Sequence, residues 1–339
     1  MTTNRSWVLL RRPVGVPQLE DFEIREHAIP KPAEDEVLLR VLYAAMDPAI
    51  RGFMNAGGGY AAPLALGAPI KGMVLGRVLR SKSHDLAEGD IVWGFGSWSD
   101  YTTAPAAQLH RPPLDAGLDL SAYLHVLGTI GLTAHYGLFD IAAIRPGARV
   151  LVSGAAGAVG SLAGQMARIA GAARVIGIAG GAEKCARAAA DYGYDACIDY
   201  KAAPDLPAAI GAALPEGIDV CFENVGGASL DGALAHLRKN ARIALCGMIS
   251  GYNAEAPSLK NAWSLVVNTA RIHGFRVTDV LADRVRTATM LAEIAGWIDA
   301  GKLRWQVDIR DGFEAIPESF LCLFSGDHNG RLLVQLDGD

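Results

Sequence analysis

The middle of the chain alternates between short apolar runs and longer segments whose apolar residues recur at helical spacing. The apolar runs, rich in Val, Ile and Ala, predict buried strands at 149–153, 174–179, 196–198, 218–223, 241–247 and 271–277. The segments between them predict helices at about 159–171, 182–191, 205–213, 229–238 and 259–269. Strands and helices in this order are typical of an α/β protein with a doubly wound parallel sheet.

The two ends of the chain follow a different pattern. Up to about residue 125, strand-like runs at 36–43, 72–79 and 90–95 are separated by frequent Pro and Gly, as in a small barrel or a curled sheet. After a predicted helix at about 280–300, the chain returns to this pattern, with strands at 303–309 and 331–336 and a helix at 312–324. We therefore expect a β-rich domain, residues 1–125 plus 303–339, into which an α/β domain, residues 126–302, is inserted.

Composition narrows the class of partner. The net charge of −5 argues against nucleic acid or an anionic membrane surface as the main partner. No apolar stretch is long and charge-free enough to span a bilayer. The five cysteines are scattered without a C-x-x-C pair, and most stand in apolar runs. We interpret them as reduced thiols and expect a cytoplasmic protein.

A glycine-rich turn follows the first strand of the predicted sheet. In Val150-Leu-Val-Ser-Gly-Ala-Ala-Gly-Ala-Val-Gly-Ser161, an apolar run leads through this turn into an amphipathic segment. A strand, a glycine turn and a helix in this order seat the pyrophosphate of a dinucleotide on the helix N-terminus. Gly157 and Gly160 fill the second and third glycine places of the G-x-G-x-x-G fingerprint, whereas Ala155 stands in the first. The alternative is an ordinary glycine turn of an α/β protein.

Motifs along nearly the whole chain resemble those of one enzyme family. They are Tyr43 through Asp47-Pro48 to Arg51-Gly52 and Met54, Tyr60-Ala-Ala-Pro63, Gly96-Ser-Trp-Ser-Asp-Tyr101, Gly131-Leu-Thr-Ala134, Ala155-Ala-Gly-Ala-Val-Gly-Ser161, Glu183-Lys184, Asp199-Tyr200-Lys201, Glu223-Asn-Val-Gly-Gly227, Cys246-Gly-Met-Ile-Ser-Gly-Tyr-Asn253 and Gly330-Arg331. On these motifs the chain resembles the zinc-independent medium-chain dehydrogenase/reductases. Within that family it is most similar to leukotriene B4 dehydrogenase/prostaglandin reductase, plant alkenal double-bond reductases and bacterial curcumin-reductase-like enzymes.

The resemblance implies a Rossmann sheet inserted into a GroES-like, barrel-like catalytic domain, with NADP(H) as the cofactor. The residues expected to contact the cofactor are Gly157, Ala158, Val159, Gly160, Lys184, Tyr200, Asn224, Cys246, Gly247, Met248, Ile249, Ser250, Tyr252, Phe275, Arg276, Val277, Thr133, and His328 or Asn329. Two of these assignments have plainer alternatives: a turn asparagine for Asn224 and edge-strand packing for 275–277. No metal site is expected, because Met46 stands where zinc-dependent relatives carry a ligand cysteine, and no cysteine precedes Cys185.

The choice of NADP(H) over NAD(H) depends on the end of the second predicted strand. That strand ends in Ala179-Gly180-Gly181, and no acidic residue follows until Glu183. An NAD site wants an acid at this strand end to bind the ribose 2′-hydroxyl. The gap leaves room for a 2′-phosphate with Lys184 as its partner, and the resemblance implies Tyr200 as a second contact. The alternative for Lys184 is an ordinary surface lysine.

Tyr252 is the first candidate for catalysis. Hydride addition to the β-carbon of an α,β-unsaturated ketone or aldehyde builds negative charge on the carbonyl oxygen, to which a phenol can donate a hydrogen bond. The resemblance implies the nicotinamide ribose hydroxyl as a second donor. Tyr60 is expected in the same apolar pocket, together with Met46 and Trp263, or else as an aromatic plug beneath the loop. The stretch 55–69 is where we expect substrate choice to be decided.

These residues predict NADPH-dependent reduction of a C=C bond in enones or enals. An NADPH quinone oxidoreductase of the same fold is the nearest alternative. A zinc-free oxidoreductase of secondary alcohols is chemically harder, since nothing obvious acidifies the hydroxyl. A non-catalytic NADPH-binding protein is the remote alternative, because folds and cofactor sites can outlive their chemistry.

Three further expectations concern residues outside the cofactor turn. Asp47 precedes a proline and is expected to shape a turn and to pair with Arg51 rather than to act as an acid. His135 is expected to be packed on a helix. The resemblance implies a homodimer, for which the edge strand 271–277 offers a pairing surface.

Overall fold

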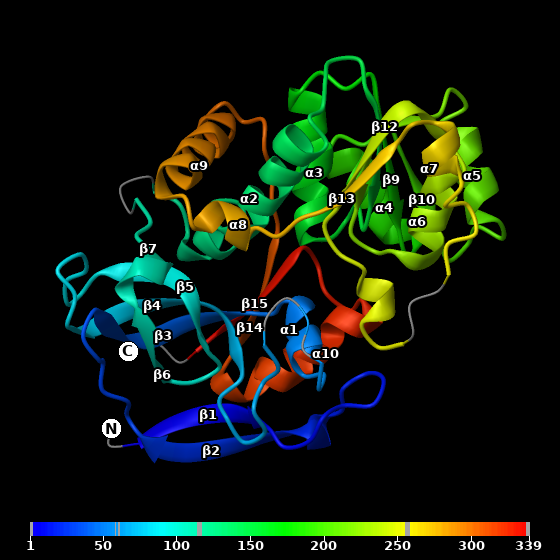
Figure 1. Cartoon of the computed structure of the whole chain (residues 1–339). Helices are drawn as coiled ribbons and strands as arrows, with labels where there is room; N and C mark the ends of the chain where they lie inside the picture. Colours follow the sequence, from blue (N-terminus) through cyan, green and yellow to red (C-terminus); the bar gives the residue numbers. More distant parts are fainter. Residues whose placement is uncertain (1–2, 58, 60–61, 114–116, 255–257, 337–339) are drawn as a thin grey trace. The chain divides into compact units, whose positions relative to one another are not determined.

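The computed structural model describes residues 3–57, 59, 62–113, 117–254 and 258–336. The chain divides into two units (Figure 1). The β-rich unit comprises Met1–Leu124 and Val307–Asp339, and the α/β unit comprises His125–Gln306. In sequence, the α/β unit is therefore inserted into the β-rich unit.

A parallel sheet forms the centre of the α/β unit. Its strands are β8 (Arg149–Ser153), β9 (Arg174–Ala179), β10 (Ala196–Asp199), β11 (Ile218–Glu223), β12 (Leu237–Leu245) and β13 (Arg271–Gly274). They are ordered β10-β9-β8-β11-β12-β13, and every neighbouring pair is parallel. Val150, Leu151 and Val152 are fully buried, as expected of a strand covered on both faces. The predicted doubly wound sheet is confirmed.

The helices between these strands cover both faces of the sheet. They are α3 (Ala158–Ile169), α4 (Ala182–Asp191), α5 (Leu206–Ala213), α6 (Gly227–Leu234) and α7 (Ser264–Val267). The chain moves from β8 to β10 in one direction along the sheet and from β11 to β13 in the other. Because such crossovers are right-handed, α3 and α4 lie on the opposite face from α6 and α7. Ile210 of α5 and Leu230 of α6 share one apolar cluster on that second face.

The remaining helices of the α/β unit are α2 (Thr129–His135), which continues as the π-helix η5 (Tyr136–Ile141), α8 (Thr278–Leu281) and α9 (Arg284–Asp299). His135 joins α2 to α9. Its ring stacks on Trp297 at 5.6 Å, and its Nε2 lies 2.7 Å from a carboxylate oxygen of Glu293. The prediction of a packed histidine is confirmed. Within the described residues, no helix is both long and apolar enough to cross a membrane.

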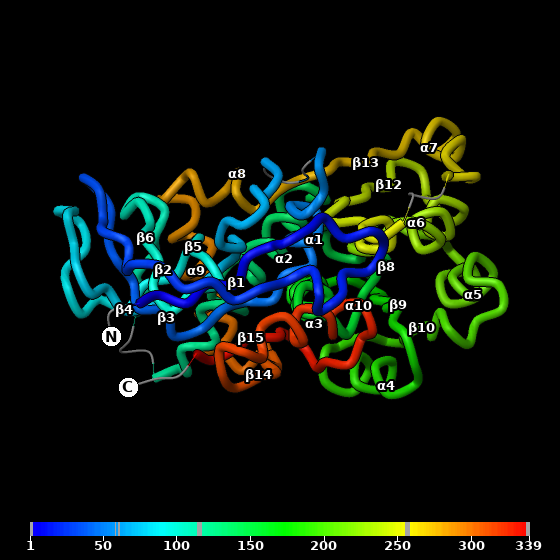
Figure 2. Tube along the Cα trace, turned by 90° about the horizontal axis from the view of Figure 1, so that it is seen from below, coloured from blue at the N-terminus to red at the C-terminus, as the bar shows by residue number. Residues whose placement is uncertain are grey.

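The β-rich unit is organised around β3 (Glu36–Ala45). The main sheet has the order β14-β15-β3-β4-β5-β7, and β6 also pairs with β3. Its other strands are β4 (Lys71–Ser81), β5 (Ile91–Ser97), β6 (Tyr101–Pro105), β7 (Leu109–His110), β14 (Val307–Asp311) and β15 (Arg331–Gln335). Since β3 pairs with three strands, the sheet bends around it. The C-terminal segment, with α10 (Ile316–Ser325), returns beside β3 (Figures 1 and 2).

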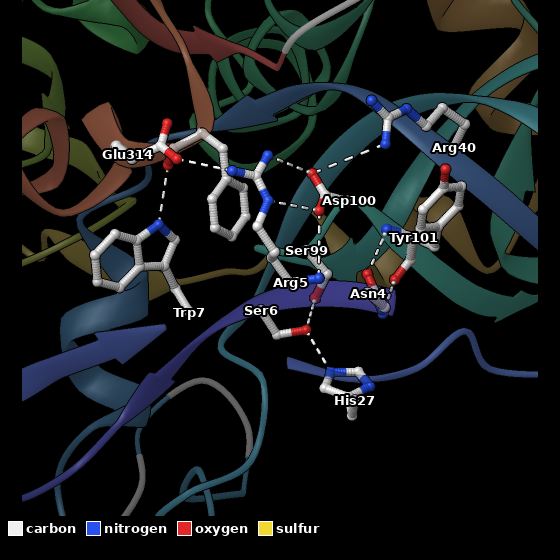
Figure 3. A network of polar contacts seen from close by, with 11 residues as sticks. Asn4, Arg5, Ser6, Trp7, His27, Arg40, Ser99, Asp100, Tyr101 and Glu314 are labelled. Atoms are coloured by element: carbon white, nitrogen blue, oxygen red, sulfur yellow. Dashed lines mark hydrogen bonds and ion pairs between the residues drawn. The ribbon is translucent and has the colours of Figure 1, made fainter. Parts of the chain in front are cut away.

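A second, two-stranded sheet of β1 (Thr3–Leu9) and β2 (Phe22–Ala28) belongs to the β-rich unit. The buried carboxylate of Asp100 fastens it to the main sheet (Figure 3). It accepts hydrogen bonds from Nε of Arg5 at 2.9 Å and from its NH2 at 3.1 Å, and it lies 3.8 Å from Arg40 of β3. Arg5 also pairs with Glu314 at 2.7 Å. The short runs between turn residues at this end of the chain had not predicted β1 and β2.

The prediction for 229–241 is wrong at the junction of helix and strand. The helix α6 ends at Leu234, and β12 begins at Leu237 rather than at 241. Asn240 has a φ of 63°, and the β11–β12 register shifts between Ile218 and Val220. A bulge therefore carries the polar residues 238–240 inside the strand, although in sequence they resemble a turn.

Two other predicted elements are shorter or displaced. Only Ser264–Val267 of the predicted helix 259–269 is helical, since Asn261 donates its backbone N–H and its side-chain amide to Asp231. The predicted strand 303–309 begins only at Val307. Before it, the backbone N–H and C=O of Arg304 bond to the side chain of Gln165, both at 2.8 Å, in place of a neighbouring strand.

Candidate active site

The sheet order places a crevice between β8 and β11. From these two neighbours the chain runs to opposite faces, and ligands of doubly wound folds bind at the carboxyl ends of such strands. The β8–β11 ladder ends at the pair Val152–Phe222. Ser153 and Glu223 follow directly, and both side chains are fully buried. The floor of the crevice is therefore polar although the strands leading to it are apolar.

Glu223 is the centre of this polar floor. Its Oε1 accepts hydrogen bonds from the hydroxyl of Ser153 at 2.6 Å and from the backbone N–H groups of Val225 and Gly226, both at 2.8 Å. Its Oε2 accepts from the hydroxyl of Ser229 at 3.2 Å. Burial raises the pKa of Glu223, and these hydrogen bonds oppose that rise. The carboxylate joins β8, β11 and the start of α6.

The segment after β12 is attached to the segment after β11 by main-chain hydrogen bonds. The carbonyl of Glu223 accepts from the N–H of Cys246 at 2.8 Å, and the carbonyl of Val225 accepts from the N–H of Ser250 at 3.0 Å. Tyr252 ends this segment, half-buried, after the short 3₁₀ helix η6 (Ile249–Gly251). The predicted contact residues 246–250 are thereby held against the crevice.

Asn224 belongs to the same construction. Its side-chain amide donates to the carbonyl of Ser153 at 2.7 Å, and its backbone N–H donates to the hydroxyl of Ser153 at 2.8 Å. Asn224 therefore ties the two sides of the crevice together, as the turn interpretation requires. Its amide oxygen remains on the same strand end as the predicted cofactor contact.

The N-terminus of α3 can receive an anion. Its N-cap is Gly157, so no side chain caps it. Among the described residues, no acceptor bonds the backbone N–H groups of Ala158, Val159 and Gly160. A Cβ on Gly160 would lie 2.2 Å from the carbonyl oxygen of Gly154, so only glycine allows this close turn. Three unbonded amides at a helix N-terminus fit the pyrophosphate of a dinucleotide.

The neighbouring helices α4 and α6 are different, because a carboxylate of this chain already accepts hydrogen bonds at their N-termini. Asp199 accepts from the N–H of Gly181, the N-cap of α4, at 2.8 Å. Glu223 accepts from the N–H of Gly226, the N-cap of α6, at 2.8 Å. A second negative group at either place would be repelled. The structure therefore favours α3 as the helix that takes the pyrophosphate.

The end of β9 gathers positive and aromatic side chains. Tyr200 and Lys201 lie over the turn, since a Cβ on Gly180 would come within 2.8 Å of the Tyr200 ring and 3.1 Å of the Lys201 side chain. Lys184 is in the first turn of α4. The nearby acid, Asp199, accepts from the backbone N–H groups of residues 181 and 201, and these bonds, led by the one from residue 181, lower its pKa. Lys201 is a neighbour that the sequence analysis did not single out.

Other predicted contacts of the α/β unit vary in their surroundings. Phe275 is buried in the core, edge-on to Tyr136 at 5.5 Å, which matches the packing alternative for that side chain. Arg276 is exposed and pairs with Asp279 at 3.0 Å, and Val277 is the N-cap of α8. Thr133 donates its hydroxyl to the carbonyl of Thr129 at 2.6 Å.

In the β-rich unit, the ion pair predicted for Asp47 is wrong. Asp47 pairs with Arg331, whose NH1 and NH2 lie 2.5 and 3.0 Å from its two carboxylate oxygens. Arg331 is 2 % exposed and also donates to the carbonyls of Leu124 and Met46. Arg51 instead donates to backbone carbonyls and to Asn55. A buried arginine 284 residues from its partner leaves no local signal in the sequence.

The remaining pocket predictions divide in three. Tyr60 lies outside the described residues. Met46 is 1 % exposed within an apolar core cluster, and Trp263 is 72 % exposed. His328 contacts the carbonyl of Cys322 through Nδ1 at 3.2 Å, and Asn329 donates its backbone N–H to Asp308 at 3.2 Å. Among the described residues, no group of three or more His, Cys, Asp or Glu side chains is arranged to hold a metal ion.

Glu223 and Ser153 are the functional residues that the sequence analysis missed. A signal was present, because an acid directly follows the apolar strand Ile218–Phe222, where an unpaired charge would be costly. The motif around Glu223 had been noted for its asparagine alone.

Comparisons with known proteins agree with this architecture. Two family models match: "N-terminal domain of oxidoreductase" over residues 5–111 and "Zinc-binding dehydrogenase" over residues 158–295. The chain is 41 % identical to the putative NADP-dependent oxidoreductase YfmJ of Bacillus subtilis, covering 99 % of both chains. It is 36 % identical to the NADPH-dependent curcumin reductase of Escherichia coli, covering 99 % of this chain and 98 % of that protein.

Among solved structures, the chain is similar to CurA from Vibrio vulnificus in complex with NADPH. The TM-score is 0.89 at 35 % identity, with 99 % of this chain and 100 % of that chain covered. The similarity extends over both units and both family models. The chain therefore belongs to the zinc-independent medium-chain dehydrogenase/reductase family, in the group that includes curcumin, alkenal and prostaglandin reductases.

Proposed function

We propose that this protein uses NADPH to reduce the C=C bond of α,β-unsaturated ketones or aldehydes. The observation that carries the proposal is the uncapped N-terminus of α3 beside a β9 end that offers Lys184, Tyr200 and Lys201. The first feature suits a pyrophosphate and the second a ribose 2′-phosphate. The relatives include an NADPH-dependent curcumin reductase and an NADP(+)-dependent 2-alkenal reductase.

In the proposed reaction the protein orients the enone and stabilises charge on its oxygen. When bound, NADPH supplies a hydride for the β-carbon, and its nicotinamide ribose supplies a second hydroxyl donor. Tyr252 donates a hydrogen bond from its phenol to the carbonyl oxygen as the enolate forms. The α-carbon then takes a proton from solvent or a nearby hydroxyl, which completes the saturated ketone. The segment 246–250 and Glu223 hold Tyr252 in place through the hydrogen bonds described above.

The test is NADPH oxidation over a panel of enals, enones and quinones, with NADH in parallel. Turnover of enones with a saturated ketone as product supports the proposal. Turnover of quinones alone would make the protein a quinone oxidoreductase. Binding of NADPH without turnover of any acceptor would make it a non-catalytic binding protein.

Lys184→Ala is expected to raise KM for NADPH by roughly 10–100-fold, the value of a lost charge-assisted hydrogen bond. KM for NADH should stay near that of the wild type, because NADH has no 2′-phosphate. Lys239→Ala, which removes an exposed lysine from β12, is the matched control and should change neither value. Equal losses with both coenzymes would contradict the role given to Lys184.

We also infer that two copies of the chain associate through β13. In the described part of the sheet β13 pairs only with β12, and all four of its residues are exposed. Directly before it in the chain, Trp263, Val266 and Val267 are 72 %, 64 % and 65 % exposed. An edge strand with exposed apolar neighbours can pair with its own copy about a two-fold axis.

Val267→Asp is expected to convert the dimer to a monomer, because it introduces a charge into the apolar part of the interface. Light scattering during gel filtration measures the mass. Val285→Asp is the matched control, since Val285 is 79 % exposed on α9 and away from the proposed interface in sequence. A wild-type protein that elutes as a monomer would refute the association.

A further inference from the structure

A loop leaves the β-rich unit between Met54 and Leu64. It follows α1 (Ala49–Phe53), and its two ends are joined by a hydrogen bond from the N–H of Leu64 to the carbonyl of Phe53 at 2.8 Å. In sequence the loop contains three consecutive glycines followed by Tyr60. Such a loop needs something at its base to restrict it, because glycine adds conformational freedom.

Arg12 bridges the base of this loop. Its NH1 donates to the carbonyl of Met54 at 2.9 Å, and its NH2 donates to the carbonyl of Leu64 at 3.1 Å. One planar guanidinium thus holds the residue before the loop and the residue after it. Among the described residues, no ion pair joins Arg12 to a carboxylate, so both of its assigned partners are carbonyls at the loop base.

A second arginine makes the reverse connection. Arg51 of α1 is 3 % exposed and donates to the carbonyls of Pro13 at 3.2 Å and Gly15 at 2.9 Å, while its NH1 donates to the side chain of Asn55 at 2.5 Å. The segment that carries Arg12 is therefore itself fixed to α1. Within the loop, the backbone of Gly59 lies against Gly52, since a Cβ at Gly59 would come within 3.2 Å of it.

We propose that Arg12 is a positioning residue for substrate binding, acting through the base of the loop 55–63. The proposal rests on the proposed function, in which this stretch decides substrate choice. The geometry of the fork carries it, because two carbonyls that belong to opposite ends of a loop are held by one rigid group. An ammonium is a point charge on a flexible stem and reproduces that arrangement only in part.

The experiment compares Arg12→Ala, Arg12→Lys and Arg11→Ala in the full-length protein. Arg12→Ala is expected to raise KM for a small enone by roughly tenfold, with KM for NADPH and the melting temperature unchanged. Arg12→Lys should recover part of the loss. Arg11 is the matched control, because its side chain is 63 % exposed and pairs with Asp21 rather than with the loop. Its replacement by Ala should leave KM unchanged.

A second readout does not depend on activity. Chymotrypsin cleaves after tyrosine, so the rate at which a fragment beginning at residue 61 appears reports opening of the loop. Arg12→Ala should raise this rate by about fivefold or more, and Arg11→Ala should not.

The outcomes separate the two proposals. Wild-type enone KM and a wild-type cleavage rate in Arg12→Ala would overturn the role of Arg12. A rise in both KM values with a lower melting temperature would assign Arg12 a general structural role and also overturn it. If the wild type reduces no enone, the proposed function fails, and the cleavage rate still decides whether Arg12 holds the loop.

Discussion

Tyr252→Phe is expected to lower kcat for enone reduction by about 10²–10³-fold, the usual cost of removing one donor to a developing oxyanion. The substitution removes only the phenol hydroxyl. The backbone N–H of Tyr252 still donates to the carbonyl of Ile249 at 3.2 Å, so the segment keeps its place. KM for NADPH should therefore change by no more than about threefold. Single-turnover measurements of NADPH oxidation separate the chemical step from binding.

A matched control for this experiment is Tyr192→Phe. Tyr192 is a buried tyrosine of the same unit, at the C-terminal end of α4, outside the proposed site. It should leave kcat unchanged. If Tyr252→Phe reduced every enone as fast as the wild type, the oxygen of the substrate would have to be stabilised by another group.

Glu223→Ala is expected to lower the free energy of unfolding by about 3–5 kcal/mol, as happens when a buried charged network loses its centre. The hydroxyls of Ser153 and Ser229 and the N–H groups of Val225 and Gly226 would lose their acceptor in a buried place. Urea unfolding followed by circular dichroism measures the change. Binding of NADPH should weaken as well, because the same bonds hold the crevice. Unchanged stability would mean that water replaces the carboxylate at no cost.

Glu223→Gln separates the charge of the carboxylate from its shape, because the amide keeps one acceptor oxygen and does not titrate. The pKa of Glu223 is raised in the folded protein by burial. The folded state therefore holds the proton to higher pH than the unfolded state, whose glutamates titrate near 4.3. The wild type should lose stability relative to Glu223→Gln as the pH rises from about 4 through the folded pKa. A relative stability that is flat or rises with pH would contradict the sign of this shift.

The α/β unit was predictable because its signals are local. The strands β8, β9 and β11 begin and end at the residues that their apolar runs predict. The errors lie where a distant contact outweighs the local pattern. Apolar residues at 263–267 suggested a packed helix, yet Trp263 and Val266 are mostly exposed and only one helical turn forms. The polar residues 238–240 suggested a turn, yet a bulge carries them within β12.

Of the candidate site, the sequence could predict which residue types stand at the strand ends but not how they are connected. Gly157 and Gly160 were identified from spacing, and the close approach of Gly160 to Gly154 gives the physical reason for the glycine. The partners of buried charges were not predictable. Asp47 pairs with Arg331 across the whole length of the chain, and Glu223 bonds across the crevice to Ser153. Such pairs depend on which strands become neighbours, and nothing in the nearby sequence encodes that.

The surroundings of Arg331 have a consequence for how this protein can be rebuilt. Its Nε donates to the carbonyl of Leu124, the last residue before the inserted unit. It is also the register partner of Val307, the first residue after that unit. The chain thus leaves and re-enters the β-rich unit beside one side chain, a few ångströms apart. A short linker could close this gap, so residues 125–306 form an exchangeable cassette. Coenzyme-binding units of related reductases could be exchanged there without rerouting any strand of the host.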